Sequence, residues 1–284
     1  MKIKYLFIIF NAIIILFLLT ICLMPLFTTG QNFVPPIWRS LRPMALIPGL
    51  VLIVLDIFYF SNRRLFALLE RGDYPALVGY LEMRVLRRGH YFSPLVRLLA
   101  NSYLAMADTT GVSNLENKVA VVKPALLESN ALVFGVARIL GGDLAGAVRF
   151  FAARLPPGEA GDRNAGRRRV GSRALPWVRW YYGFSLLLDR QFSPAAEQFK
   201  PLAEGSPDTL IVGLSAYFLG TTLQRNTENG LVCLAAAQGA RSRIQETIRD
   251  KAGWLAKAGK LKHEVHTVIL QKYIEEAGDW LFGG

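Results

Sequence analysis

RILGGDLAGAVRFFAARLPP, residues 138–157, carries the pattern that decides the fold. It reads as the turn and the second helix of a helical hairpin, with a small residue in the turn and Asp143 placed to cap the helix that follows. The pairs Gly72-Asp73, Ala107-Asp108 and Gly142-Asp143 recur at a constant spacing of 35 residues, each after an apolar helical segment. A fixed period of this length is typical of stacked helical hairpins, so the sequence predicts a repeat protein.

This pattern resembles the tetratricopeptide repeat, a unit of two antiparallel helices with small residues at fixed places and an aromatic residue in the second helix. Two units match well, and their small and aromatic residues are, in chain order, Gly135, Ala147, Phe151, Gly183, Ala195 and Phe199. Small residues let the two helices of a hairpin approach closely while the aromatic rings fill the groove between hairpins. The resemblance implies an all-α fold, a solenoid of α-α hairpins over residues 61–240.

The other units follow the pattern less closely. The first keeps the Gly72-Asp73 turn but has Leu65 and Leu77 where small residues are expected. The second loses register after Asp108, where TTGVSNLENK reads as a lengthened turn. A fifth unit is assigned to residues 210–240, and residues 241–284 are expected to form two capping helices, 241–258 and 260–277.

A basic insert separates the third unit from the fourth at about residues 156–175. Glycine, asparagine and serine surround its arginines, which indicates an exposed loop. Two interpretations remain open, a contact with an anionic partner or lipid headgroup and a solvated tether. The arginines of the insert are Arg163, Arg167, Arg168, Arg169 and Arg173.

Two apolar runs precede the repeats and predict a membrane anchor in residues 1–60. The first, Tyr5 to Phe27, has 23 residues without a charge, more than the about 20 that cross a bilayer as a helix. It is too long for the apolar stretch of a signal peptide, and no small-x-small cleavage site follows it. The second, Met44 to Phe60, has 17 residues; it is read as a second span, with a re-entrant or interfacial helix as the alternative.

Asp56 lies in the second run, barely over a turn from its end. It is expected to reach interfacial water or a partner helix, and an ion or proton pathway is the alternative. Basic residues flank both runs. This favours a protein of the inner or plasma membrane with both termini on the cytoplasmic side and a cytoplasmic repeat domain. Residues 28–43, with Pro35-Pro36, would form an outside link without regular structure. If only the first run spans, the repeat domain lies outside instead.

Composition and motifs argue against several classes of function. The net charge of +12 fits a basic domain beside an anionic membrane, and no aromatic-interleaved basic stripe points to nucleic acid. His263 and His266 are three residues apart, whereas a metalloprotease helix needs histidines four apart. No phosphate loop, nucleophile elbow or dinucleotide fingerprint occurs, so neither an enzyme, nor a metal site, nor a cofactor is expected.

The resemblance implies a concave groove, lined by the first helices of successive hairpins, that holds a peptide or a partner helix. The candidate partner-binding residues are Arg97, Asn101, Trp177, Trp180 and Tyr181, although these aromatics are also candidates for burial between hairpins. Arg97 and Asn101 match the first positions of a carboxylate clamp, but Val133 stands where the clamp needs asparagine, so docking of a terminal carboxylate is not expected.

The expected function is a membrane-anchored scaffold or adaptor that binds another protein through its repeats, as a member of a membrane complex in contact with lipid. The alternatives are an extracytoplasmic repeat domain in envelope assembly, and an accessory subunit of a membrane enzyme or transporter.

Overall fold

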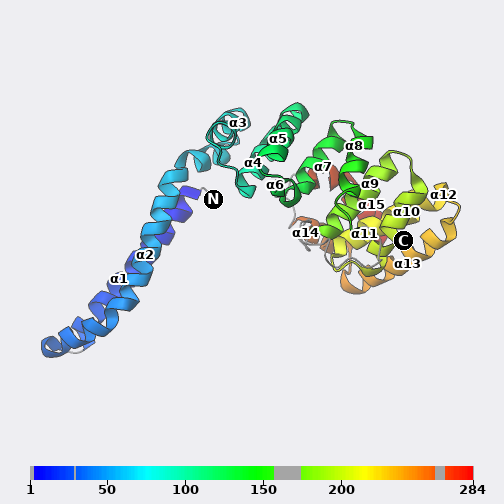
Figure 1. Ribbon diagram of the computed structural model, residues 1–284. Helices are drawn as coiled ribbons and strands as arrows, with labels where there is room; N and C mark the ends of the chain where they lie inside the picture. The colour runs from blue at the N-terminus through cyan, green and yellow to red at the C-terminus, as the bar shows by residue number, and fades with distance from the viewer. Residues whose placement is uncertain (1–2, 29, 157–173, 260–265, 284) are drawn as a thin grey trace. The chain divides into compact units, whose positions relative to one another are not determined.

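The computed structural model describes residues 3–28, 30–156, 174–259 and 266–283, and every regular element in them is helical. The chain divides into two compact units, Met1–Tyr80 and Leu81–Gly284. The all-α class predicted from the sequence is confirmed for the described residues (Figure 1).

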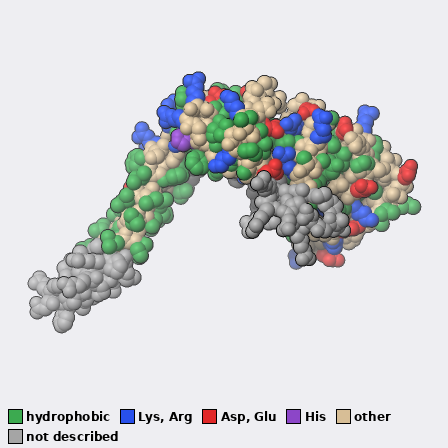
Figure 2. Space-filling model, viewed as in Figure 1, with side chains coloured by type: hydrophobic (Ala, Val, Ile, Leu, Met, Phe, Trp, Pro, Cys, Tyr) green, Lys and Arg blue, Asp and Glu red, His purple; other side chains and the backbone are tan. Residues whose placement is uncertain are grey.

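The first unit is built on two long helices, α1 (Ile3–Thr28) and α2 (Gly30–Arg71), which pack against each other and are followed by α3 (Tyr74–Glu82). Within them, Lys4–Ile21 and Leu46–Arg71 are long and apolar enough to cross a membrane, and neither stretch is buried by the protein. Apolar side chains dominate their described surface in Figure 2. The two apolar helices expected from the sequence are therefore present.

Residues 28–43 differ from the expected unstructured link. The helix α2 begins at Gly30 and continues through Pro35 and Pro36 to Arg71, so the expected anchor boundary at residue 60 also lies inside a helix. Proline holds φ near the helical value, which makes a helix through these residues possible despite the hydrogen bonds that proline cannot donate. The apolar runs therefore mark the apolar parts of the helices and not the helix ends.

The second unit consists mainly of antiparallel helix pairs. Its elements are η1 (Met83–Arg87), α4 (Ser93–Ala105), α5 (Thr109–Val122), α6 (Ala125–Ser129), α7 (Ala131–Leu140), α8 (Leu144–Ala152), α9 (Leu175–Leu188), α10 (Phe192–Gly205), α11 (Thr209–Phe218), η3 (Leu219–Leu223), α12 (Gln224–Asn226), α13 (Gly230–Thr247), α14 (Lys251–Gly259) and α15 (His266–Phe282). The first helices of successive pairs pack side by side, since α4 contacts α7, α7 contacts α9, and α9 contacts α11.

One turn geometry recurs in both units. A residue with positive φ occurs at Gly72, Ala107, Gly142 and Arg190, with φ of 65°, 57°, 78° and 61°. In each turn the next residue donates its main-chain N–H to the carbonyl five residues earlier, as Asp143 does to Arg138 at 2.9 Å. This is the bond that closes a helix C-terminus around a left-handed residue. The turns predicted at Gly72, Ala107 and Gly142 are therefore observed.

The expected lengthened turn at residues 109–118 is wrong, because this segment forms most of helix α5. Asp108 accepts a hydrogen bond from the N–H of Gly111 at 2.8 Å and caps the helix. Val112, Leu115 and Val119 are buried at helical spacing. Burial of this apolar face outweighs the weak helix propensity of Thr109-Thr110-Gly111, so the 35-residue register is kept.

Two glycine–phenylalanine contacts hold the third and fourth pairs together. A Cβ built on Gly135 would overlap the ring of Phe151, and one on Gly183 would lie 3.2 Å from the Cζ of Phe199. Both rings are fully buried. The predicted role of these small residues, close approach of two helices over an aromatic ring, is therefore seen in both pairs.

The C-terminal helices have other bounds than expected. Residue 241 lies inside α13, and α14 and α15 replace the expected helices 241–258 and 260–277. The helix α15 contacts α7, α11 and α13. Near its end, Leu281 is buried, and the guanidinium of Arg241 lies 5.4 Å from the centre of the Trp280 ring. The C-terminus thus packs on the last helix pair.

Candidate functional site

A cavity of about 330 Å³ opens on helix α4. It is lined by Ser93, Pro94, Arg97, Leu98 and Asn101. These residues recur every three or four positions, which places them on one face of the helix. The structure therefore brings together two of the residues that the sequence singled out, Arg97 and Asn101.

Neighbouring residues fix the polar groups of this cavity, which we call the α4 pocket. Arg97 donates from Nε to the Oδ1 of Asn130 at 3.3 Å and from Nη2 to the carbonyl of Ser129 at 3.2 Å. Asn130 is buried and itself donates to the carbonyl of Leu126 at 2.9 Å. These contacts orient the Arg97 guanidinium, so a ligand meets a cation held by a buried amide.

Asn101 supplies the second polar feature of the α4 pocket. Its Oδ1 is buried and accepts no hydrogen bond. A buried acceptor without a donor costs about 1–3 kcal/mol, and a ligand N–H would remove this cost. One face of α4 thus carries an oriented cation and a residue whose buried acceptor lacks a donor.

The aromatic candidates lie in the core rather than on a free surface. Trp180 and Tyr181 are fully buried, and Trp177 is 8% exposed. Trp180 stacks on Phe184 with ring centres 5.1 Å apart and meets Phe199 at 5.9 Å. All three aromatic residues are therefore buried, which is the alternative that the sequence left open.

Helix α15 covers this aromatic cluster. The ring of Tyr273 lies 5.3 Å from that of Phe184 and 5.2 Å from that of Phe218. Tyr217 on α11 donates its hydroxyl to Glu276 of α15 at 2.8 Å. Burial, together with this hydrogen bond, raises the pKa of Tyr217 to about 12. The C-terminal helix α15 therefore covers the surface of α9 and α11, the first helices of the last pairs.

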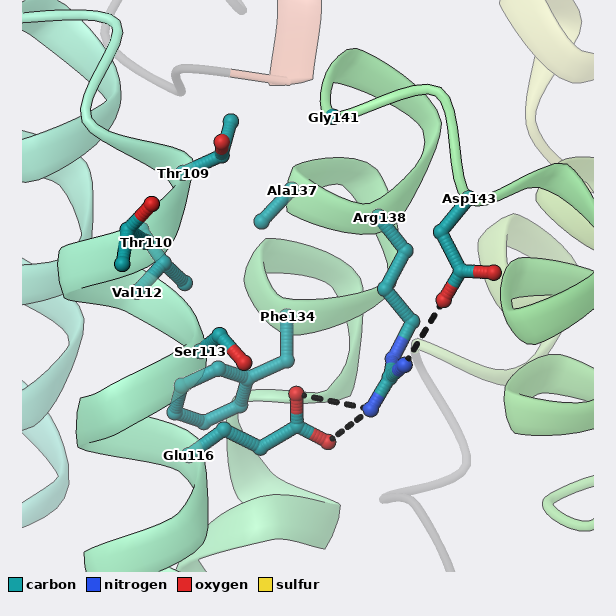
Figure 3. Close-up of a pocket in the computed structure, with 10 residues that line it drawn as sticks. All are labelled: Thr109, Thr110, Val112, Ser113, Glu116, Phe134, Ala137, Arg138, Gly141 and Asp143. Atoms are coloured by element: carbon teal, nitrogen blue, oxygen red, sulfur yellow. Dashed lines mark hydrogen bonds and ion pairs between the residues drawn. The ribbon is translucent and has the colours of Figure 1, made fainter.

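A second cavity, of about 270 Å³, lies between α5 and α7. Figure 3 shows Arg138 reaching across it from α7 to Glu116 on α5 and to Asp143 in the turn. The Nη2 of Arg138 lies 2.9 and 3.0 Å from the two carboxylate oxygens of Glu116, and Nη1 lies 3.1 Å from Oδ2 of Asp143. One guanidinium thus connects two successive helix pairs.

The electrostatics of this cavity favour a structural role. Burial lowers the pKa of Arg138, but the hydrogen bonds and charges of Glu116 and Asp143 outweigh it, and the net shift is upward. Arg154, which does not line the cavity, stacks 3.5 Å from the centre of the Phe150 ring, and burial lowers its pKa although Glu128, at 3.4 Å, opposes the shift. Arg138 already has two anionic partners, so we assign this cavity to contact between successive helix pairs.

Glu116 is a site residue that the sequence patterns did not predict, although a signal was present. Glu116 precedes the buried Phe151 by one 35-residue period, so it takes the place that an aromatic ring fills in the next pair. A carboxylate there needs a cationic partner when it is buried. Arg138 is that partner, supplied by the neighbouring pair.

Asp56 also has a partner that the sequence analysis did not name. Asn11 of α1 donates from Nδ2 to the Oδ1 of Asp56 on α2 at 2.8 Å, while its own Oδ1 is buried and accepts no hydrogen bond. Phe7 stacks on Tyr59 nearby, with ring centres 3.8 Å apart. Asp56 therefore contacts a neighbouring helix, in agreement with the expectation that it reaches interfacial water or a partner helix. Asn11 is the only polar side chain besides Thr20 in the first apolar run up to Ile21, and that was the available signal.

Several sequence candidates fall outside the described residues. The arginines of the basic insert, Arg163, Arg167, Arg168, Arg169 and Arg173, lie in residues 157–173, and the side chains of His263 and His266 are likewise not described. Among the residues that the structure describes, no three His, Cys, Asp or Glu side chains are grouped closely enough to hold a metal ion.

The fold and the sites define a class: an all-helical protein in which two long apolar helices precede a unit of packed helix pairs. The chain belongs to the family described as "Uncharacterised Treponema protein", whose model matches residues 111–283. It is also similar to an uncharacterized protein of Treponema pallidum (strain Nichols), with 27% identity over 296 residues, covering 99% of this chain and 88% of that relative. No solved structure matches the chain significantly.

Proposed function

We propose that this protein is a membrane-anchored scaffold that binds another protein through its second unit and performs no chemistry of its own. The observation that carries the proposal is the α4 pocket, which is lined by an oriented guanidinium and by Asn101, whose buried Oδ1 has no hydrogen-bond partner. Buried polar atoms in proteins nearly always have hydrogen-bond partners, so an exception in a cavity is a sign of a missing ligand.

The anchor in this proposal is a hairpin of α1 and α2 across an inner or plasma membrane. Support comes from the length of the two apolar stretches and from the absence of protein cover over them. The Asn11–Asp56 hydrogen bond supports a second span, because it provides a partner at the place where a carboxylate in hydrocarbon is costly. With both helices spanning, the basic residues that flank them favour a cytoplasmic second unit.

The second unit is, in this proposal, a solenoid of the tetratricopeptide type. The recurring left-handed turns, the constant spacing of 35 residues and the two Gly–Phe contacts support it. In such a solenoid the first helices line a groove, and α15 covers the part of it formed by the later pairs. The α4 pocket is then the open end of the groove, and the partner is a polypeptide segment that supplies an N–H to Asn101 and an acceptor to Arg97.

Affinity capture of the full-length protein from membranes in mild detergent tests the proposal. We expect a specific set of proteins to co-purify with the unchanged chain and with Arg149→Ala, which removes an exposed arginine of α8. Arg97→Ala and Asn101→Ala should each lose that set. Capture of the same proteins by all four chains would contradict the assignment of binding to the α4 pocket.

A reporter that is active on only one side of the membrane, fused to the C-terminus, tests the cytoplasmic location. Activity on the outer side would favour the alternative, an extracytoplasmic repeat domain in envelope assembly.

A further inference from the structure

One end of the α4–α5 pair carries an exposed apolar patch. Val121 is 84% exposed, Val122 57% and Phe92 58%. The valines end helix α5, and Phe92 immediately precedes α4. Because the two helices are antiparallel and packed together, all three lie at the end opposite the turn at Met106–Asp108. Lys123 joins them, since its Nζ donates to the carbonyl of Tyr91 at 3.4 Å. We call the side chains of Phe92, Val121 and Val122 the apolar tip.

Basic residues lie close to the apolar tip in the sequence. Arg87, Arg88, Lys118 and Lys123 are all exposed, and residues 83–92 and 117–124 contain no acidic residue. Figure 2 shows Lys and Arg side chains, together with some Asp and Glu side chains, on the surface in the region that α4 and α5 occupy in Figure 1. Packing inside this unit does not explain why these apolar side chains are exposed beside several cations.

The composition of this patch fits the interface of an anionic bilayer. Apolar and aromatic side chains gain free energy by entering the boundary between headgroups and acyl chains, and basic side chains are attracted to anionic headgroups. The patch follows the apolar helix α2 closely in the chain, and such a tether raises the effective concentration of a lipid surface around it. An acidic protein would match the charges but would not benefit from this tether.

We propose that the apolar tip inserts into the headgroup region of a membrane that contains anionic lipid, so that the second unit has its own membrane contact beside the anchor. This inference rests on the proposed membrane anchor. It assigns no role to the α4 pocket.

The test uses the full-length protein in lipid nanodiscs, with an environment-sensitive fluorophore on Val121→Cys after Cys22→Ala and Cys233→Ala. The matched control carries the fluorophore on Leu231→Cys, which is 85% exposed on α13. In discs of phosphatidylglycerol that contain a nitroxide-labelled lipid, the label at 121 should be quenched and the label at 231 should stay bright. Arg87→Gln and Arg88→Gln should each weaken the membrane contact about fivefold. Discs of phosphatidylcholine, which lack anionic lipid, should also weaken it.

The outcomes separate this inference from the anchor. Co-elution of the protein with the discs reports on the anchor, and failure to incorporate would overturn both proposals. Incorporated protein with an unquenched label at 121, or with equal quenching at 121 and 231, would overturn the apolar tip as a membrane contact and leave the anchor intact.

Discussion

Single residues set the spacing of the helix pairs. Gly135 lets α7 lie directly on the ring of Phe151, and Gly183 does the same for Phe199. The sequence predicted these contacts because a small residue and an aromatic recur at the same separation in both pairs. The Glu116–Arg138 contact was not predictable in the same way, since periodicity marks which positions are buried but not which distant residue neutralises a charge.

Gly135→Ala should destabilise the second unit by about 1–3 kcal/mol, because the added methyl group enters space that the Phe151 ring fills. Gly239→Ala is the control, since a Cβ at this position in α13 meets no atom within 4 Å. It should stabilise the protein by up to about 1 kcal/mol through helix propensity. Denaturant unfolding in detergent measures both, and equal effects would contradict the packing described for Gly135.

Glu116→Leu should destabilise the protein by about 2 kcal/mol, because Arg138 loses its bidentate partner while Asp143 remains. Arg138→Leu should cost at least as much, since it leaves the carboxylate of Glu116 buried without a cation. The double variant should lose less than the sum of the two. A double-mutant cycle by chemical unfolding checks this, and strict additivity would mean that the ion pair does not couple the two helix pairs.

At the scale of elements, the helices that a local pattern defines were predicted well and those that depend on distant contacts were not. The turns after Gly72, Ala107 and Gly142 follow from residues within a few positions. Helix α5 was missed because its first residues favour a turn and only tertiary burial of Val112, Leu115 and Val119 makes it a helix. The position of α15 over α11 depends on the rings that Tyr273 meets, which no periodicity reveals.

The contact between Tyr217 and Glu276 makes the attachment of α15 sensitive to alkaline pH. The pKa of Tyr217 is about 12 in the folded chain against an ordinary value of 10.0. A raised folded-state pKa stabilises fully below pH 10, and this stability is lost as the pH rises from about 10 to 12. Tyr217→Phe should be less stable at pH 8 by about 1 kcal/mol, and the difference should shrink above pH 10. Thermal unfolding at a series of pH values measures it, and a constant difference would contradict the assigned bond.

At the scale of the whole molecule, a pair of long apolar helices precedes a unit of packed helix pairs. The fold class and the two apolar helices were predictable because both follow from composition and period. The α4 pocket was predictable in part, since Arg97 and Asn101 came from a resemblance whereas their contacts with Asn130 and Ser129 required the structure. The pairing of Asn11 with Asp56 depends on how two helices align, which their sequences leave open.

The Asn11–Asp56 bond should hold the two apolar helices in register. In a chain with Phe7→Cys and Tyr59→Cys, and with the native cysteines replaced, a short bifunctional thiol reagent should link the two positions, because their rings stack in the unchanged protein. Asn11→Leu should lower the yield of this link, since a hydrogen bond between membrane helices contributes about 0.6 kcal/mol and up to 1.7. The exchange Asn11→Asp with Asp56→Asn should restore the yield. An unchanged yield in Asn11→Leu would show that packing alone sets the register.

Photo-crosslinking from the α4 pocket tests the central claim most directly. A photoreactive amino acid replaces Leu98, which lines the pocket, and in a second chain it replaces Leu231, which is exposed on α13. After irradiation in intact membranes, we expect a discrete covalent adduct with a second protein from position 98, lost with Asn101→Ala, and none from position 231. The absence of an adduct from position 98, or the same adducts from both positions, would contradict the account.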